Sequence, residues 1–288
     1  MQTEKRAVPI LSRILTQLQR GEIQIPSTPA VVTELRVLVG KSDSKIEAIV
    51  ALLERDEALL ARVLQLGRSA PFPRAGKLPD LPFIINRVGF RQISSIVETV
   101  WSNGCFQIPD PRYRPYAARI SRHALARALA MRAMAEQQRL DSFSAYLSGL
   151  FADVGASFLL WAIVDKSQGQ APEPEDALAF VREHHETVGG AVLKRWGHTD
   201  LVMGLVRRHH GLAPPAPASA PLWNLLVVAS QIARDLTQEE DVTRAEPWPP
   251  PELLQRCEAG VHLSPEQRAQ YVTKLEEEYA SALAALIQ

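Results

Sequence analysis

"GLFADVGASFLL", residues 149–160, is the stretch that decides how this chain folds and what chemistry it can support. It is apolar enough to be a buried helix, yet it contains one carboxylate, Asp153, directly after Ala152. A carboxylate among apolar residues is either a metal ligand or a core group held by hydrogen bonds. Either role needs partners from other segments, so the rest of the chain decides between the two alternatives.

Helical periodicity continues on both sides of this stretch. Apolar residues recur at three- and four-residue spacing, for example Ile10, Ile14 and Leu18, whereas strand-like alternation is scarce. The spacing predicts an all-α fold, a multi-helix bundle of two lobes. The helices expected in the second lobe cover residues 117–138, 142–164, 175–196, 199–210 and 221–236.

Proline-rich breaks divide the helical pattern. The first is "QIPDPRYRPY", residues 107–116, which we interpret as a hinge between the two lobes. The predicted organisation is an N-terminal helix (1–22), a domain over 23–236 with lobes 23–108 and 109–236, and a C-terminal helical extension (237–288).

Composition argues for a soluble cytoplasmic protein. Lysine plus arginine and aspartate plus glutamate both number 32, so the formal net charge is zero and no overall field favours nucleic acid. The N-terminus lacks the apolar core of a secretory signal, and Asp153 interrupts the most membrane-like stretch. Cys105 and Cys257 lie far apart, which predicts a reducing compartment and no zinc cluster. We expect no membrane partner.

Six stretches in the order of the chain resemble the HDOD domain family, a relative of the HD phosphohydrolases that include the HD-GYP enzymes acting on cyclic-di-GMP. They are "IPSTPAVVTEL" (25–35), "LLERDEALLARVLQLGRSAPF" (52–72), "IINRVGFRQISSIV" (84–97), "GLFADVG" (149–155), "HETVGGAVLKRW" (185–196) and "VRRHHG" (206–211). The resemblance runs from about residue 23 to about residue 234 and implies that the second lobe is HD-like.

The resemblance also implies a set of metal-site positions. The superfamily's ligands correspond to His123, Asp153, His185, His209 and His210. Histidines and a carboxylate on neighbouring helices of a bundle can hold a divalent metal. The alternative is that each of these side chains is satisfied locally, as most scattered polar residues are.

Two positions depart from the superfamily pattern. The histidine of the His-Asp pair is Ala152, and the late aspartate falls on about Ser230. A methyl group cannot ligate, and a lost carboxylate leaves a dication poorly compensated. We therefore expect no metal, no cofactor and no catalysis, with Asp153 a structural carboxylate paired with a nearby histidine such as His123.

The resemblance implies a non-catalytic bacterial signal-transduction module that docks to protein partners, in a network of the two-component, motility or cyclic-di-GMP type. The loop "SAPFPRAGKLPDLPF" (69–83) is a candidate contact surface, with Phe72 and Phe83 as apolar anchors. Two alternatives stay open: a residual metal-dependent phosphohydrolase and a nucleotide sensor that does not hydrolyse its ligand.

An arginine-rich segment bears on the second alternative. Residues 112–139 contain seven arginines and one acid, Glu136. They could bind an anion such as a nucleotide phosphate. The interpretation we favour is a solvated face of an amphipathic helix. Nucleic acid is disfavoured, since no pattern of interleaved aromatic residues extends beyond Tyr113 and Tyr116.

Overall fold

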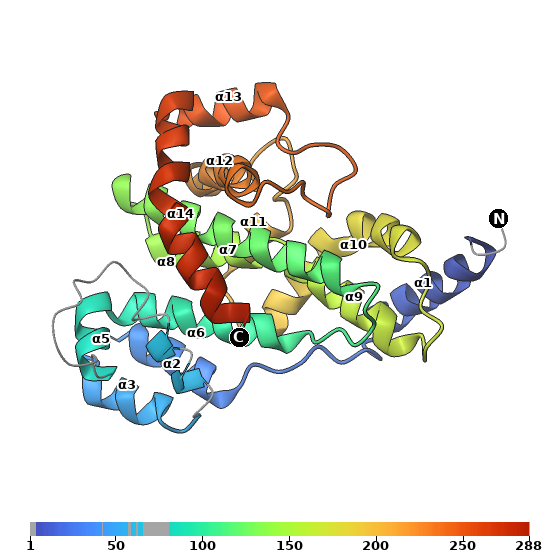
Figure 1. Ribbon diagram of the computed structural model, residues 1–288, viewed down its shortest axis with the longest axis horizontal. Helices are drawn as coiled ribbons and strands as arrows, with labels where there is room; N and C mark the ends of the chain where they lie inside the picture. Colours follow the sequence, from blue (N-terminus) through green and yellow to red (C-terminus); the bar gives the residue numbers. More distant parts are fainter. Residues whose placement is uncertain (1–3, 42, 57–58, 62, 66–80, 288) are drawn as a thin grey trace. The chain divides into compact units, whose positions relative to one another are not determined.

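Helices make up the regular structure of the chain in the computed structural model, which describes residues 4–41, 43–56, 59–61, 63–65 and 81–287 (Figure 1). No strand occurs among these residues. The all-α prediction is therefore confirmed. The cause is the three- and four-residue apolar spacing, which gives each helix one face to bury.

The chain divides into two compact units, Met1–Pro26 with Phe106–Val272 and Ser27–Cys105 with Thr273–Gln288. The first unit contains α1 (Glu4–Gln19), α7 (Arg114–Gln137), α8 (Ser142–Phe151), α9 (Val154–Lys166), α10 (Pro174–Arg195), α11 (Asp200–Val206), the 3-10 turn η1 (Pro217–Ser219), α12 (Ala220–Thr237) and α13 (Pro251–Gly260). The second contains α2 (Ala30–Val39), α3 (Ile46–Leu53), α5 (Leu81–Val88) and α6 (Phe90–Cys105). The last helix, α14 (Pro265–Ile287), begins in the first unit and ends in the second.

The second unit has its own aliphatic core. Leu35, Ile49, Leu53, Ile85 and Ile93 are fully buried in one cluster to which α2, α3, α5 and α6 contribute, together with Leu59 and Val63 from the helical residues described between α3 and α5. Each of these residues comes from the apolar stripe of its helix, so the packing follows from the sequence pattern.

The first unit is built around α7, which packs against α8 and α12, while α9 packs against α10 (Figure 1). Small residues let α7 and α8 approach closely. A Cβ on Gly149 of α8 would lie 2.8 Å from the Cα of Ala128 on α7, closer than real Cβ contacts. This contact brings the α7 side chains next to the end of α8, where the candidate site begins.

One stretch of the described residues, Ser142–Lys166, is long and apolar enough to cross a membrane by length and composition alone. Its most apolar window is 89% buried inside the protein. The apolar surface is thus used for internal packing, as in the core helices of a soluble protein.

Candidate functional site

Asp153 lies in a break between two helices. Helix α8 ends at Phe151 and α9 begins at Val154, so the continuous helix predicted for residues 142–164 is wrong at its centre. Asp153 occupies the position before the first turn of α9, with φ −101° and ψ 18°, and its side chain makes no capping hydrogen bond there. Its carboxylate points instead toward side chains of other helices.

Gly155 explains why α10 comes so close to Asp153. A Cβ on Gly155 would lie 2.0 Å from the carbonyl oxygen of His185 and 2.4 Å from the backbone nitrogen of Gly189. Because both obstacles are backbone atoms that cannot swing aside, only glycine fits. The close approach of the two backbones places His185 beside Asp153.

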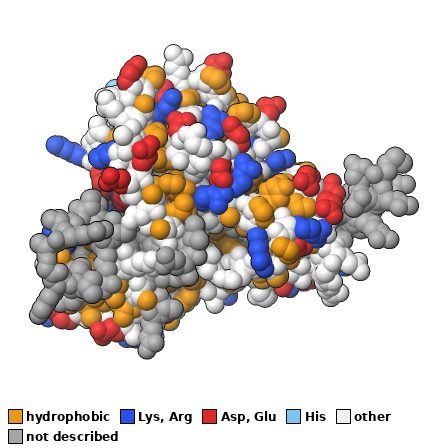
Figure 2. Space-filling model, viewed as in Figure 1, with side chains coloured by type: hydrophobic (Ala, Val, Ile, Leu, Met, Phe, Trp, Pro, Cys, Tyr) orange, Lys and Arg blue, Asp and Glu red, His pale blue; other side chains and the backbone are white. Residues whose placement is uncertain are grey.

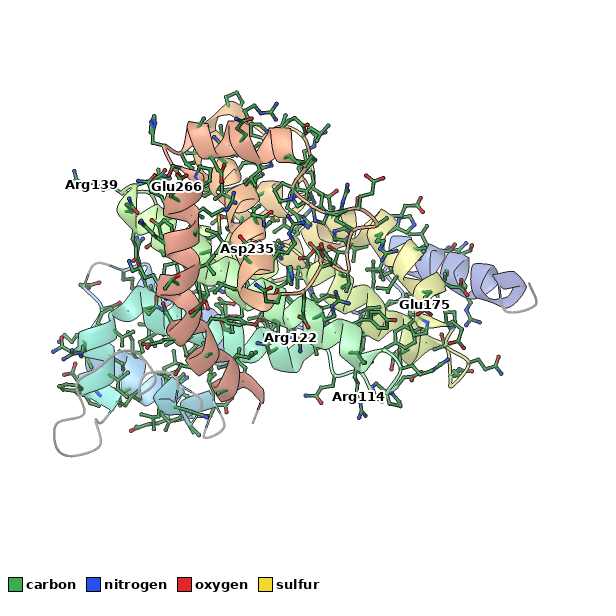
Figure 3. The ribbon with its side chains drawn as sticks, turned by 45° about the horizontal axis from the view of Figure 1, so that its top comes forward. Arg114, Arg122, Arg139, Glu175, Asp235 and Glu266 are labelled. Atoms are coloured by element: carbon green, nitrogen blue, oxygen red, sulfur yellow. The ribbon has the colours of Figure 1, made fainter. Side chains whose placement is uncertain are left out.

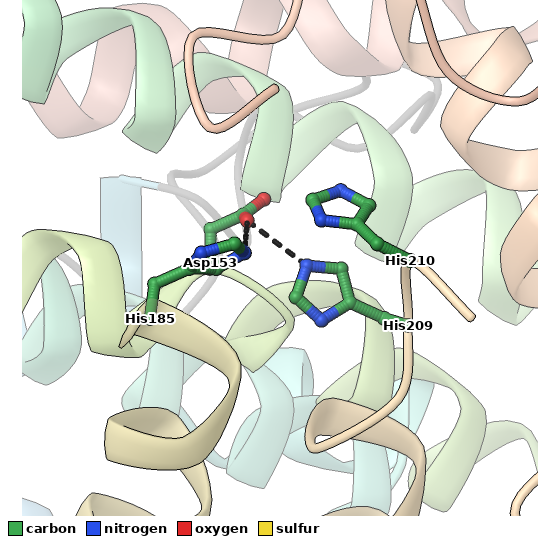
Figure 4. Close-up of side chains that lie close together, drawn as sticks. All are labelled: Asp153, His185, His209 and His210. Carbon is green, nitrogen blue, oxygen red and sulfur yellow. Dashed lines mark hydrogen bonds and ion pairs between the residues drawn. The ribbon is translucent and has the colours of Figure 1, made fainter. Parts of the chain in front are cut away.

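Two histidines direct their Nε2 atoms at the Asp153 carboxylate (Figure 4). His209, in the turn after α11, donates from Nε2 to Asp153 Oδ1 at 3.1 Å and from Nδ1 to the carbonyl of Val206 at 2.7 Å. Both of its ring nitrogens face acceptors, so the geometry favours the doubly protonated, positively charged ring. His185 Nε2 lies 3.7 Å from the same oxygen, and its Nδ1 donates to the carbonyl of Val181 at 3.0 Å.

The strongest partner of Asp153 is Arg127 of α7. Its Nη2 donates to Asp153 Oδ2, and its Nε donates to the carbonyl of Gly149 at 3.1 Å. The Arg127 side chain is 0% exposed and that of Asp153 is 1% exposed. The predicted pairing of Asp153 with His123 is thus wrong: His123 lies one turn earlier on α7, and its Nε2 donates to the carbonyl of Glu239 at 2.9 Å.

A second carboxylate, Asp241, completes the group. It follows α12, and its Oδ2 lies 3.5 Å from His210 Nε2, while its Oδ1 accepts bonds from the backbone nitrogen and hydroxyl of Thr243 at 2.8 and 2.6 Å. Ser230, where the late aspartate was expected, only returns its hydroxyl to the carbonyl of Leu226 at 2.9 Å. No sequence signal marks Asp241, since the short turn it forms with Thr243 is common in loops.

The charges of the group balance one another. Burial alone would raise the pKa of Asp153, but the charge of Arg127 and the hydrogen bond from His209 hold it well below its ordinary value near 3.8. Burial opposes the charged form of His209, yet its bond to Asp153 raises the pKa above its ordinary value near 6.5. For His210, burial dominates and lowers the pKa to about 3. Burial and the charge of Asp153 act to raise the pKa of Asp241, but its electrostatic interaction with His210, whose Nε2 lies 3.5 Å away, outweighs them and lowers it. Two cations, Arg127 and His209, therefore face the anions Asp153 and Asp241, while a third and more exposed carboxylate, Glu186, lies 3.6 Å from His209 Nδ1.

The structure brings together four of the predicted site residues. One ligand atom each from Asp153, His185, His209 and His210 lie within 4.8 Å of one another, and all four residues are buried. Ala152 is also buried and adds only a methyl group beside them. Of the predicted contact residues, Phe83 on α5 is 53% exposed, and Phe72 lies outside the described residues.

The donor set has one feature typical of a metal site and one that opposes it. His185 and His209 each donate Nδ1–H to a backbone carbonyl of their own turn, which is how metal-binding histidines are usually oriented. However, the guanidinium of Arg127 already neutralises the one carboxylate among the four donors. A dication there would face a fixed positive charge in a water-poor interior, where like charges repel strongly.

The arginine-rich segment forms the predicted solvated face only in part, because Arg112, Arg114 and Arg139 are exposed whereas other arginines are not. Arg127 is fully buried, Arg122 pairs with Glu239, and Arg112 pairs with Asp110 and Glu173. On the face drawn in Figure 2, acidic and basic side chains are interspersed, in keeping with the zero net charge. The arginines of α7 are thus used for internal ion pairs and loop contacts.

Comparisons with known proteins identify the family and the fold. The HDOD domain family model matches residues 25–212. A protein of Treponema pallidum (strain Nichols), described only as uncharacterized, is 26% identical over 247 residues, which cover 83% of this chain. This chain spans 46% of that relative, about half of its length.

Two solved structures share the fold over nearly the whole chain. One is a Shewanella amazonensis protein provisionally named a metal-dependent phosphohydrolase, with 22% identity, a TM-score of 0.69, and coverage of 99% of this chain and 100% of that one. The other is an HDOD domain protein of unknown function from Geobacter sulfurreducens, with 18% identity, a TM-score of 0.67, and coverage of 99% and 98%. A Marinobacter aquaeolei protein provisionally named for signal transduction matches 92% of this chain and 60% of its own, with 18% identity and a TM-score of 0.69.

Proposed function

The chain belongs to the HDOD domain family, and from this premise we propose that it is a non-catalytic signal-transduction module that acts by docking to protein partners. The observation that carries the proposal is the buried ion pair between Arg127 and Asp153. It supplies the positive charge that a hydrolase of the HD superfamily would obtain from its metal ions.

The charge balance supports this proposal further. Arg127 and His209 already neutralise Asp153 and Asp241, so a bound dication would leave the buried site with excess positive charge. Excess charge in a low-dielectric interior is costly. Ala152 adds no ligand at the position where the superfamily has a histidine. The residues do not fit a metal while Arg127 holds the carboxylate, and we assign no hydrolytic step to the site.

Elemental analysis and a hydrolysis assay test the proposal together. We expect the purified chain to retain no stoichiometric iron, manganese or zinc after dialysis, and to hydrolyse neither cyclic-di-GMP nor a chromogenic phosphodiester with added Mn²⁺. The variant Asp153→Asn serves as the matched control, because it removes the only carboxylate of the four-donor group. About one or two equivalents of metal in the wild type that disappear in this variant would contradict the proposal.

One observation favours a second candidate, a residual metal-dependent phosphohydrolase. His185 Nε2 is buried and has no hydrogen-bond partner, while its Nδ1 is held by a backbone carbonyl. A free, oriented imidazole nitrogen is what a metal ligand requires. Phosphodiester turnover that depends on added metal and is lost in His185→Gln would establish this candidate over the first.

The two cysteines, Cys105 and Cys257, are both free thiols, which supports our proposal of a reducing, cytoplasmic setting.

The docking part of the proposal is tested by partner capture. Phe83, exposed on α5, is a candidate anchor for a partner. Capture of a host signalling protein by the wild type but not by Phe83→Ala would support it, and equal capture would remove Phe83 from the docking surface.

A further inference from the structure

The segment that follows α12, residues 238–242, is held by basic side chains of α7 and α10; we call it the strap. Arg122 of α7, labelled in Figure 3, forms a two-pronged ion pair with Glu239, with Nε to Oε2 at 3.0 Å and Nη2 to Oε1 at 2.6 Å. Paired bonds from a guanidinium to a carboxylate are the strong, geometrically specific kind. The contact joins residues that are 117 positions apart in the sequence.

Three further basic side chains bind the backbone of the strap. His123 Nε2 donates to the carbonyl of Glu239 at 2.9 Å, and Arg119 Nη2 donates to the carbonyl of Glu240 at 2.8 Å. Arg182 Nε of α10 donates to the carbonyl of Val242 at 3.1 Å. A loop usually leaves such carbonyls to water. Here three of these carbonyls accept hydrogen bonds from two arginine side chains and one histidine side chain.

The basic side chains form one surface, which we call the basic platform: Arg119, Arg122 and His123 of α7 with Arg182 of α10. Arg119 and His123 are four residues apart on α7 and so lie on the same face of the helix. Arg119 Nε is buried without a hydrogen-bond partner, which leaves an unused donor on the platform.

The strap also closes the candidate site from one side. Asp241 follows directly after the two platform-bound residues and points inward to His210. Both ring nitrogens of His210 are buried and have no hydrogen-bond partner within normal bonding distance. Lifting the strap would therefore expose a basic surface that lacks an acidic partner, together with a histidine that lacks a hydrogen-bond partner.

We propose that the basic platform is a docking site for an extended acidic peptide of a protein partner, and that the strap is the chain's own occupant of this site. The inference rests on the docking function proposed above and names the chemistry of the partner. The platform recognises a carboxylate through Arg122 and the peptide carbonyls of residues 239, 240 and 242 through His123, Arg119 and Arg182. An inorganic phosphate could pair with Arg122, but it has no peptide carbonyls for His123, Arg119 and Arg182 to bind.

Because the strap is part of the same chain as the basic platform, it competes with an external peptide and acts as an autoinhibitor. An occupant linked to its own site has an effective concentration of about millimolar, so an external peptide must bind tightly or the strap must be weakened first. Glu239 is the residue to weaken, because its side chain is 26% exposed and its removal leaves the α7 and α10 helices intact.

Fluorescence anisotropy with a labelled synthetic peptide "QEEDVTR", residues 238–244, tests this proposal. We expect Glu239→Ala to bind the peptide about tenfold more tightly than the wild type. The reason is that the strap loses its ion pair with Arg122 and then competes less strongly for the basic platform. Glu252→Ala, an exposed acid on α13, is the control of equal charge and should bind like the wild type. Adding Arg122→Ala to Glu239→Ala should abolish binding.

Two results would overturn the proposal. One is a folded Glu239→Ala variant that binds the peptide no better than Glu252→Ala. The other is complete displacement of the peptide by millimolar inorganic phosphate, which would reassign the platform to small anions. Hydrogen exchange of residues 238–242 in the wild type gives an independent measurement, since saturating peptide should accelerate it and an unchanged rate contradicts displacement. The metal and turnover assays are separate, so failure here leaves the non-catalytic assignment standing.

Discussion

The guanidinium of Arg127 and the carboxylate of Asp153 form an ion pair with both side chains essentially inaccessible to water, at 0% and 1% exposure. The pair connects the middle of α7 to the break between α8 and α9. Two charges that are this deeply buried are tolerated because each neutralises the other and because His209 and the carbonyl of Gly149 add further hydrogen bonds, although Arg127 Nη1 is buried without a partner. The pair is therefore the central structural element of the site.

Removing one partner of the pair should be strongly destabilising. Asp153→Ala is expected to lower the free energy of unfolding by about 3–5 kcal/mol, because the guanidinium of Arg127 stays buried without a counter-charge. The double variant Arg127→Met with Asp153→Ala removes both charges and should recover most of this loss. Urea unfolding followed by circular dichroism measures both variants. Equal instability of the single and double variants would show that the unpaired charge is not the cause.

Removing the arginine alone should create a metal site. In Arg127→Met, the carboxylate of Asp153 faces His185, His209 and His210 without a competing fixed cation. We expect this variant to bind Mn²⁺ or Zn²⁺ in calorimetric titrations under conditions where the wild type shows no heat of binding. Adding Asp153→Asn should remove the new affinity. Wild-type binding as tight as that of Arg127→Met would mean that Arg127 does not exclude the ion.

His210 should make the protein sensitive to acid. Its pKa is lowered to about 3 in the folded chain, from an ordinary value of 6.5. Between these values the unfolded chain binds a proton that the folded chain does not. The free energy of unfolding should therefore fall by about 1.4 kcal/mol per pH unit, for this group, as the pH drops from 6.5 toward 3.

The variant His210→Gln should flatten this part of the stability profile, while the exposed His262→Gln should leave it unchanged. His209 acts in the opposite sense, because its pKa is raised: its stabilisation is present below pH 6.5 and is lost as the pH rises through the folded value. Thermal unfolding between pH 4 and 8 separates the two contributions. An unaltered acid slope in His210→Gln would assign the sensitivity to another group.

Gly155 should tolerate no side chain. The added Cβ of Gly155→Ala would meet the carbonyl oxygen of His185 at 2.0 Å, so α9 and α10 would have to separate, at a cost of about 1–3 kcal/mol or more. Gly204→Ala on α11 is the matched control, since its Cβ would meet only Pro215 at 3.9 Å and alanine favours a helix. Similar melting temperatures for the two variants would refute the close-packing argument.

The sequence was sufficient to predict the helical fold and most of the donors. Apolar spacing is a local property, and it placed the helix that carries His185 close to its observed bounds, but it missed the break between α8 and α9 in which Asp153 lies. The family resemblance implied that His123, Asp153, His185, His209 and His210 would form one site; one ligand atom of each of the last four lies within 4.8 Å of the others, whereas His123 bonds to the strap instead. The departures at Ala152 and Ser230 were visible as well, because they are single-residue identities.

The partners of these residues depended on the tertiary structure. Arg127 is one of seven arginines in its segment, and nothing local distinguishes it from Arg122 or Arg119. It becomes the counter-ion of Asp153 because Gly149 lets α7 and α8 come together at that level. Asp241 enters the site only because basic side chains of α7 and α10 hold the strap in place. Helix formation is decided by residues a few positions apart, whereas the charge that neutralises a buried carboxylate is decided by which backbones can approach one another.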